Sequence, residues 1–209
     1  ALGVFLDRLL SGQGLRNDLA GSTRVVPNPR GKTVVAVAPV PARAEALAMM
    51  RGAGCSKEVI SHVAAVEKLA LKIGKLCVAD PGLVSAGALL HDIGRSKTHG
   101  IGHAVEGGLI ARRLGLPTSI VRIIERHIGA GIPASEAAES GLPVRSYIPE
   151  TLEEKVVAHA DNLIGSGHRI PLSQTTGNLR RKGLVAAAER MEALHRELNE
   201  NCGKDLDEM

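Results

Sequence analysis

The chain has 209 residues, enough for one good-sized hydrophobic core or for one domain with a small appendage. Its hydrophobic fraction of 44% and charged fraction of 23% are typical of a globular protein and exclude disordered and collagen-like classes. The formal net charge of +4 permits anionic substrates or RNA without requiring them, and one Phe, one Tyr and no Trp leave few rings for stacking bases.

The first forty residues predict a small α/β appendage. Residues 2–10 place apolar side chains at helical spacing, and residues 22–38 contain two Val-rich stretches separated by Pro27-Asn28-Pro29, which predicts two strands joined by a turn. Pro39-Val40-Pro41 is then a stiff break. We therefore expect an appendage over 1–40, a mainly α domain over 41–200 and a fraying polar tail over 201–209.

The rest of the chain is dominated by helical patterns bounded by Gly or Pro. Ser56 is a predicted N-cap for a helix whose apolar stripe continues to Ile73, and Pro81 opens a helix that Gly94 closes. Residues 129–148 are predicted to form a loop with one short helix. The other expected helices cover residues 41–50, 102–114, 117–128, 149–165 and 178–200.

The spacing of the cysteines and the hydropathy of the chain indicate the cellular compartment of the protein. Cys55, Cys77 and Cys202 are odd in number, widely spaced and without a CxxC pair, so we expect buried core fillers rather than a disulfide framework or a zinc ribbon. No apolar run approaches the roughly 18 residues that span a bilayer. The initial ALGVFLDRLL contains two charges, unlike a signal peptide. We expect a protein of the reducing cytoplasm with no membrane partner.

The adjacent pair His91-Asp92, at the end of an apolar helix, is the strongest functional signal. A buried bare carboxylate such as Asp161 costs several kcal/mol unless it is paired or bound to a metal. Imidazole and carboxylate together are typical ligands of catalytic Mn, Fe, Ni, Co or Zn. The predicted metal ligands are His62, His91, Asp92, His103, His127 and Asp161.

Two ions held by this set suit phosphoester hydrolysis. We expect His62, His91, Asp92 and Asp161 to hold the first ion, and Asp92 to bridge it to a second ion held by two further histidines, so that the ions clamp a phosphoryl group and activate water. Asp92 is also a predicted catalytic residue. Arg95 and Lys97 follow it and could meet phosphate charge, while His99 is a candidate for substrate contact.

The order His62, His91-Asp92, Asp161, with HDIG at 91–94, resembles the HD-domain superfamily of metal-dependent phosphohydrolases. The resemblance implies an all-helical bundle, and His103 and His127 resemble its two-metal branch. The runs HDIGRSKTHGIGHAVEGG and ERHIGAG are similar to an archaeal group that includes the phosphodiesterase of dihydroneopterin 2′,3′-cyclic phosphate. The implied substrate is a small phosphorylated molecule, nucleotide-like or pterin-like, including cyclic phosphates.

Residues 1–36 carry a second resemblance. ALGVFLDRLLSGQGL and VVPNPRGKTVV are similar to the C-terminal end of archaeal SPOUT-class tRNA (cytidine-56) 2′-O-methyltransferases. This implies the end of a methyltransferase fused to an HD domain, without the loops that hold S-adenosylmethionine, and it makes tRNA a possible partner.

Two alternatives to hydrolysis remain open. The polypeptide's role could be tRNA methylation with the HD part subsidiary, or the domain could be a non-catalytic nucleotide or RNA-binding module. Arg180-Arg181-Lys182 is where RNA contact is first expected. His159, His168 and His195 are read as ordinary core or surface residues.

Overall fold

The computed structural model describes residues 23–28, 31–36, 38–165 and 167–208, and the chain divides into two compact units, Ala1–Pro39 and Val40–Met209. In the first unit, β1 (Thr23–Asn28) pairs antiparallel with β2 (Gly31–Ala36), and Asn28 lies opposite Gly31. The predicted strand pair is therefore present. The predicted helix at 2–10 lies outside the described residues.

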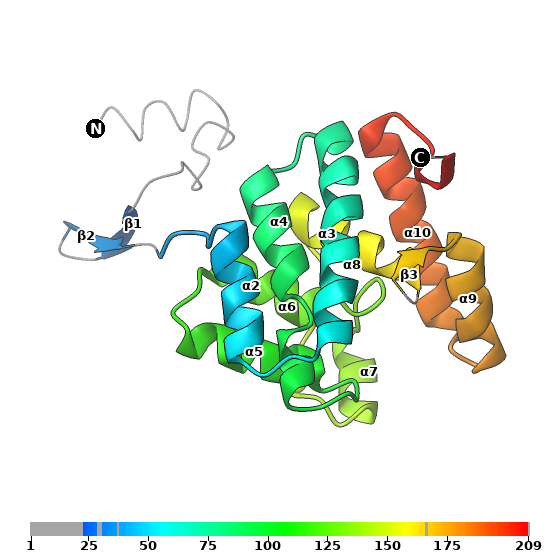
Figure 1. Ribbon diagram of the computed structural model, residues 1–209, viewed down its shortest axis with the longest axis horizontal. Helices are drawn as coiled ribbons and strands as arrows, with labels where there is room; N and C mark the ends of the chain where they lie inside the picture. The colour runs from blue at the N-terminus through cyan, green and yellow to red at the C-terminus, as the bar shows by residue number, and fades with distance from the viewer. Residues whose placement is uncertain (1–22, 29–30, 37, 166, 209) are drawn as a thin grey trace. The chain divides into compact units, whose positions relative to one another are not determined.

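The second unit is mainly helical, as the sequence predicts (Figure 1). Its β structure is one short hairpin, in which β3 (Ile164–Gly165) pairs with β4 (His168–Arg169). The helices are α2 (Arg43–Gly52), α3 (Lys57–Cys77), α4 (Pro81–Leu90), η1 (Ile93–Ser96), α5 (His103–Arg113), α6 (Thr118–Arg126), α7 (Ala134–Glu139), α8 (Leu152–Asn162), α9 (Leu172–Arg181), α10 (Val185–Cys202) and η2 (Leu206–Glu208). None of the described helices is long and apolar enough to cross a membrane.

Side-chain caps lie at the start of three of the helices that carry the site, α3, α4 and α8. The Ser56 side chain accepts a hydrogen bond from the backbone N–H of Val59 at the start of α3, and Asp80 accepts one from Leu83 at the start of α4. Thr151 does the same for Glu154 at the start of α8. Each cap satisfies a backbone donor that has no partner inside the helix, and so fixes where the helix begins.

The core lies between these helices. One cluster, which includes Ile73, Val156 and Leu198, joins α3, α8 and α10, and a second, which includes Met50, Leu90 and Ile124, joins α2, α4 and α6. The α4 helix packs against α3, α6 and α8, and its residues from Val84 to Leu90 are buried apart from Ser85. This central position delivers the end of α4, and with it His91 and Asp92, into the middle of the bundle.

The C-terminal region differs from the prediction in two ways. The single helix expected over 178–200 is two helices, because the chain turns at Gly183, whose φ of 78° favours glycine. The tail expected to fray over 201–209 instead continues α10 to Cys202 and adds η2, where Leu206 is fully buried. Leu206 is buried in the core and so anchors this segment, although its neighbours in the sequence are polar.

The cysteine prediction was wrong for two of the three residues. Cys77 at the end of α3 and Cys202 at the end of α10 form a disulfide across 125 residues of sequence, whereas Cys55 is free. Spacing rules detect local pairs such as CxxC, and they carry no information about residues that only folding brings together. The disulfide links α10 to α3, the helix that carries His62.

A candidate metal centre

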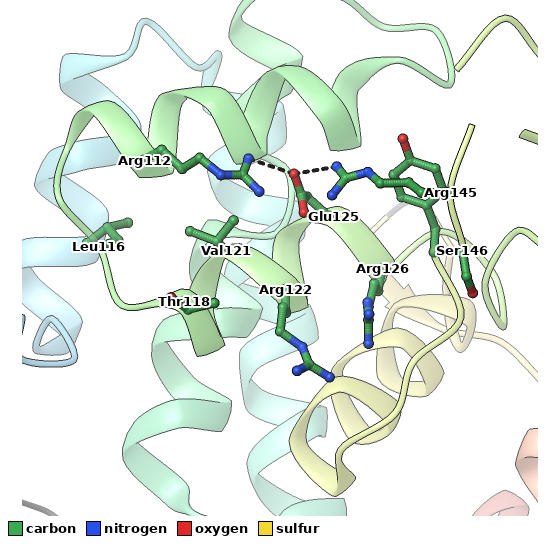
Figure 2. Close-up of a pocket in the computed structure, with 10 residues that line it drawn as sticks. Arg112, Leu116, Thr118, Val121, Arg122, Glu125, Arg126, Arg145 and Ser146 are labelled. Carbon is green, nitrogen blue, oxygen red and sulfur yellow. Dashed lines mark hydrogen bonds and ion pairs between the residues drawn. The ribbon is translucent and has the colours of Figure 1, made fainter. Parts of the chain in front are cut away.

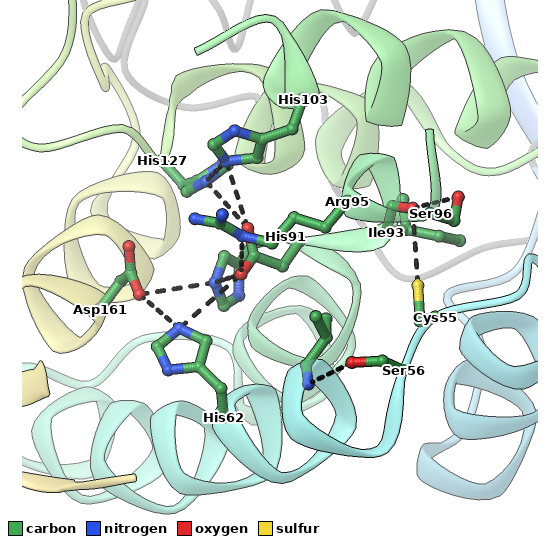
Figure 3. Close-up of polar contacts among 12 residues, drawn as sticks. Cys55, Ser56, His62, His91, Ile93, Arg95, Ser96, His103, His127 and Asp161 are labelled. Carbon is green, nitrogen blue, oxygen red and sulfur yellow. Dashed lines mark hydrogen bonds and ion pairs between the residues drawn. The ribbon is translucent and has the colours of Figure 1, made fainter. Parts of the chain in front are cut away.

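The six predicted ligands come together in one cluster, from α3, α4, η1, α5, α6 and α8. Asp92 belongs to two of the ligand groups in this cluster, and the histidines that share those groups with it are labelled in Figure 3. His62 and Asp161 are at one end of the cluster, with His62 Nε2 2.9 Å from Asp161 Oδ1, and His103 and His127 are at the other. Six side chains that are spread over residues 62–161 therefore meet at a single site.

The two oxygens of Asp92 face two different sets of histidines. Oδ2 lies 3.6 Å from His91 Nε2 and 3.8 Å from His62 Nε2. Oδ1 lies 3.2 Å from His103 Nε2 and 3.7 Å from His127 Nε2. This carboxylate is placed as a bridge between two groups of nitrogen and oxygen atoms.

Three histidines are oriented by backbone carbonyls one turn earlier. The Nδ1 atoms of His91, His103 and His127 each lie 2.7–2.8 Å from the carbonyl oxygen of the residue three positions before. A carbonyl oxygen only accepts hydrogen bonds, so each Nδ1 must carry a proton and donate it. That arrangement turns Nε2 towards the cluster centre, as in metal sites where an outer hydrogen bond fixes the tautomer of the ligand.

The Nε2 atoms and carboxylate oxygens inside the cluster have too few hydrogen-bond donors among them. His103 Nε2 and His127 Nε2 are 2.9 Å apart, so two lone pairs would face each other unless a cation or an extra proton lies between them. Among the described residues, His91 Nε2 and Asp92 Oδ1 are buried without a hydrogen-bond partner. Buried polar atoms without a partner are costly, and a divalent cation would satisfy all of them. The donor set therefore fits metal ions.

Helix ends add negative potential at the same place. His91 caps the C-terminus of α4, His127 caps that of α6, and Asp161 lies in the last turn of α8. The C-terminus of a helix carries a partial negative charge that favours cations. Asp161 is thus at a helix end, because α8 stops at Asn162 instead of running to residue 165 as the sequence predicts.

The protonation pattern of the cluster reflects burial and mutual charge. Burial lowers the pKa of His91, but Asp92 and Asp161 outweigh it and raise that pKa to about 9. Burial raises the pKa of each of these carboxyls, and the facing histidines, His91 foremost, lower it further than burial raises it. Burial and the charge of His91 lower the pKa of His127 to about 3. The carboxylates therefore stay ionised, and His127 stays neutral as a ligand requires.

The predicted catalytic residues around the ligands are placed differently from one another. Arg95 Nε donates to Asp92 Oδ2 at 2.6 Å, and its side chain is 32% exposed. Lys97 and His99 are exposed on the turn that follows η1 and are not members of the ligand groups. His62 and Asp161 keep 25% and 22% of their side chains exposed, so the cluster opens to solvent beside them.

Three groups that orient the ligands were not predicted from the sequence. They are the carbonyl groups of Ala88, Gly100 and Ile124, which orient the histidines. Backbone atoms leave no side-chain signal. The spacing of three residues to each histidine could have indicated them only once the turns at those histidines were known.

Comparisons with known proteins agree with this architecture. Residues 59–165 match the HD domain family. A tRNA (cytidine(56)-2'-O)-methyltransferase of Thermoplasma volcanium is 46% identical over the whole chain, and one of Picrophilus torridus is 44% identical. The chain spans 61% and 60% of the length of these two relatives.

Two further matches cover mainly the helical unit. An uncharacterized protein of Methanocaldococcus jannaschii is 50% identical over 56% of this chain and 73% of its own. The HD domain of the L. monocytogenes phosphodiesterase PgpH, solved with cyclic-di-AMP, aligns over 75% of this chain and 96% of its own at 15% identity and a TM-score of 0.48. By its match over residues 59–165, the chain belongs to the HD domain family.

Proposed function

We propose that this protein is a metal-dependent phosphohydrolase that cleaves a phosphoester of a small nucleotide-like or pterin-like substrate, 2′,3′-cyclic phosphates included. The proposal rests on the position of Asp92. Its two carboxylate oxygens face two separate histidine groups at the ends of buried helices. His62, His91, Asp92 and Asp161 would hold one ion, and Asp92, His103 and His127 a second. Divalent ions held there would lower the pKa of water and neutralise phosphoryl charge.

The chain's own residues have distinct tasks in this proposal. His91, His103 and His127 are held in one tautomer by their carbonyl partners, so their lone pairs stay aimed inward. Arg95 uses one guanidinium N–H on Asp92 and keeps others for a phosphate oxygen beside the open edge. Lys97 and His99, exposed in the segment that follows η1, are proposed to contact the leaving group or the rest of the substrate.

The test is a hydrolysis assay on the purified protein with Mn²⁺, Fe²⁺, Ni²⁺, Co²⁺ or Zn²⁺ and with EDTA. The substrates are phosphomonoesters, 2′,3′-cyclic nucleotides and dihydroneopterin 2′,3′-cyclic phosphate. Asp92→Asn should lower turnover at least about 100-fold because ligand loss exceeds the effect of losing an outer partner. Asp205→Asn, an exposed Asp outside the cluster, should keep full activity. Absence of turnover with every metal, or full turnover in Asp92→Asn, contradicts the proposal.

A second candidate function rests on the relatives that match the full length of the chain. The two proteins named tRNA (cytidine(56)-2'-O)-methyltransferase are longer than this chain, which makes it a candidate part of such a polypeptide in the cytoplasm. The reading frame upstream of Ala1 tests this: a frame that encodes a cofactor-binding methyltransferase domain supports it, and a stop codon beside a start codon defeats it. Metal content without turnover, together with salt-sensitive tRNA binding, would instead indicate a non-catalytic binding module.

A further inference from the structure

A second concave site lies on the surface formed by α5, α6 and the segment around Tyr147. It is a pocket of about 370 Å³ whose lining includes four arginines, Arg112, Arg122, Arg126 and Arg145, and Arg112 and Arg145 converge on Glu125 (Figure 2). None of the six cluster residues lines it. The proposed hydrolysis therefore leaves this pocket without a role.

Buried carboxylates hold these guanidinium groups in place. Glu125 is 5% exposed and accepts from Arg112 Nη1 and Arg145 Nη2, both at 2.7 Å. Glu154 is 2% exposed and accepts from Arg122 Nε at 2.8 Å and Arg126 Nη1 at 3.0 Å. Arginines anchored at one nitrogen lose little further side-chain entropy when their other nitrogens bind a ligand.

Each arginine keeps unused donors. A guanidinium has five N–H groups in a planar fork, and the carboxylate anchors take one or two of them. Four arginines against Glu125, Glu154 and the more exposed Glu150 leave the group with a net positive charge. A concave, positively charged site with fixed forked donors is suited to an anion with several oxygens.

We propose that this arginine pocket binds a phosphate group, carried either by a free nucleotide or by an RNA backbone. Phosphate is favoured over a base-reading contact because Tyr147 is 2% exposed and its ring is covered by Arg145, whose guanidinium carbon lies 4.7 Å from the ring centroid. The pocket volume falls within the range of small-molecule sites, so it accommodates a group of nucleotide size. The site recognises charge and shape, independently of the metal cluster.

The experiment is calorimetric titration of the full chain, in EDTA, with inorganic phosphate, AMP and a tRNA transcript. The variant is Arg145→Gln, which leaves Arg112 paired with Glu125, and the matched control is Arg43→Gln. Arg43 is an exposed arginine paired with the buried Glu67 at 2.9 Å, as Arg145 is with the buried Glu125, and it lies outside the arginine pocket. Thermal melting checks that both variants stay folded.

We expect phosphate to bind the wild type and the Arg43→Gln control equally, and to bind Arg145→Gln about tenfold more weakly. Competition by AMP alone assigns the phosphate to a free nucleotide, and competition by tRNA with a reduced salt dependence in Arg145→Gln assigns it to RNA. The proposal is overturned by absence of binding for all three ligands, by equal binding to Arg145→Gln and wild type, or by an oligoglutamate peptide that binds as tightly as phosphate. Because EDTA removes metals, these outcomes are independent of hydrolysis.

Discussion

Gly94 lies so close to the start of α5 that a β-carbon on it would be 1.9 Å from the carbonyl oxygen of His103. The helix that carries His103, α5, can therefore pack against η1 only because residue 94 has no side chain. The glycine two positions after Asp92 sets how near His103 comes to that carboxylate.

We therefore expect Gly94→Ala to separate η1 from α5 and move His103 away from Asp92. The variant should lose about 1–3 kcal/mol of unfolding free energy through overpacking and at least about tenfold in metal affinity. Gly177→Ala is the matched control, because a β-carbon there meets nothing within 4 Å and α9 gains helix propensity. Urea denaturation and Mn²⁺ titration measure both effects. Unchanged Mn²⁺ affinity in Gly94→Ala would show that this close packing does not position the ligand.

Metal binding should release about one proton per chain at pH 7. Without metal, burial lowers the pKa of His91 but Asp92 and Asp161 raise it to about 9, so His91 is protonated at pH 7 and must lose that proton to become a ligand. His127, with its pKa lowered to about 3, has none to lose. Apparent Mn²⁺ affinity should rise about tenfold per pH unit up to about pH 9 and then level off.

Calorimetry in two buffers of different ionisation enthalpy counts the protons. Release near one at pH 7 and near zero above pH 9 is the expected result. Affinity that is flat between pH 6 and 9 would contradict the protonation state assigned to His91.

The disulfide between Cys77 and Cys202 should stabilise the helical unit. It joins the ends of α3 and α10 across 125 residues, and cross-links that close long loops restrict the unfolded chain most. We expect Cys202→Ser to lower the free energy of unfolding by about 2–4 kcal/mol. Cys55→Ser, at the free cysteine, is the control. Equal stability of Cys202→Ser and wild type under non-reducing conditions would argue that this bridge does not hold the fold.

Residue type and order predicted which six side chains meet in one cluster, because metal chemistry restricts which side chains can serve as ligands. The apolar stripe of α3 and the Pro81 start of α4 predicted the helices for a similar reason, since periodicity and caps are local. The Cys77 pairing and the anchoring of Leu206 could not be predicted, because both depend on residues far away in sequence. The arginine pocket escaped too, since its four arginines are spread over residues 112–145 and meet only around Glu125 and Glu154.

In the proposed metal centre, Asp92 is a ligand of both ions. The most direct test is the number of Mn²⁺ ions retained per chain after gel filtration, measured by elemental analysis for wild type, His103→Gln and Asp92→Asn. We expect two ions in the wild type, one in His103→Gln, whose loss empties only the site shared with His127, and none in Asp92→Asn. A wild type that retains no divalent ion, or an Asp92→Asn variant that retains both, would contradict the account.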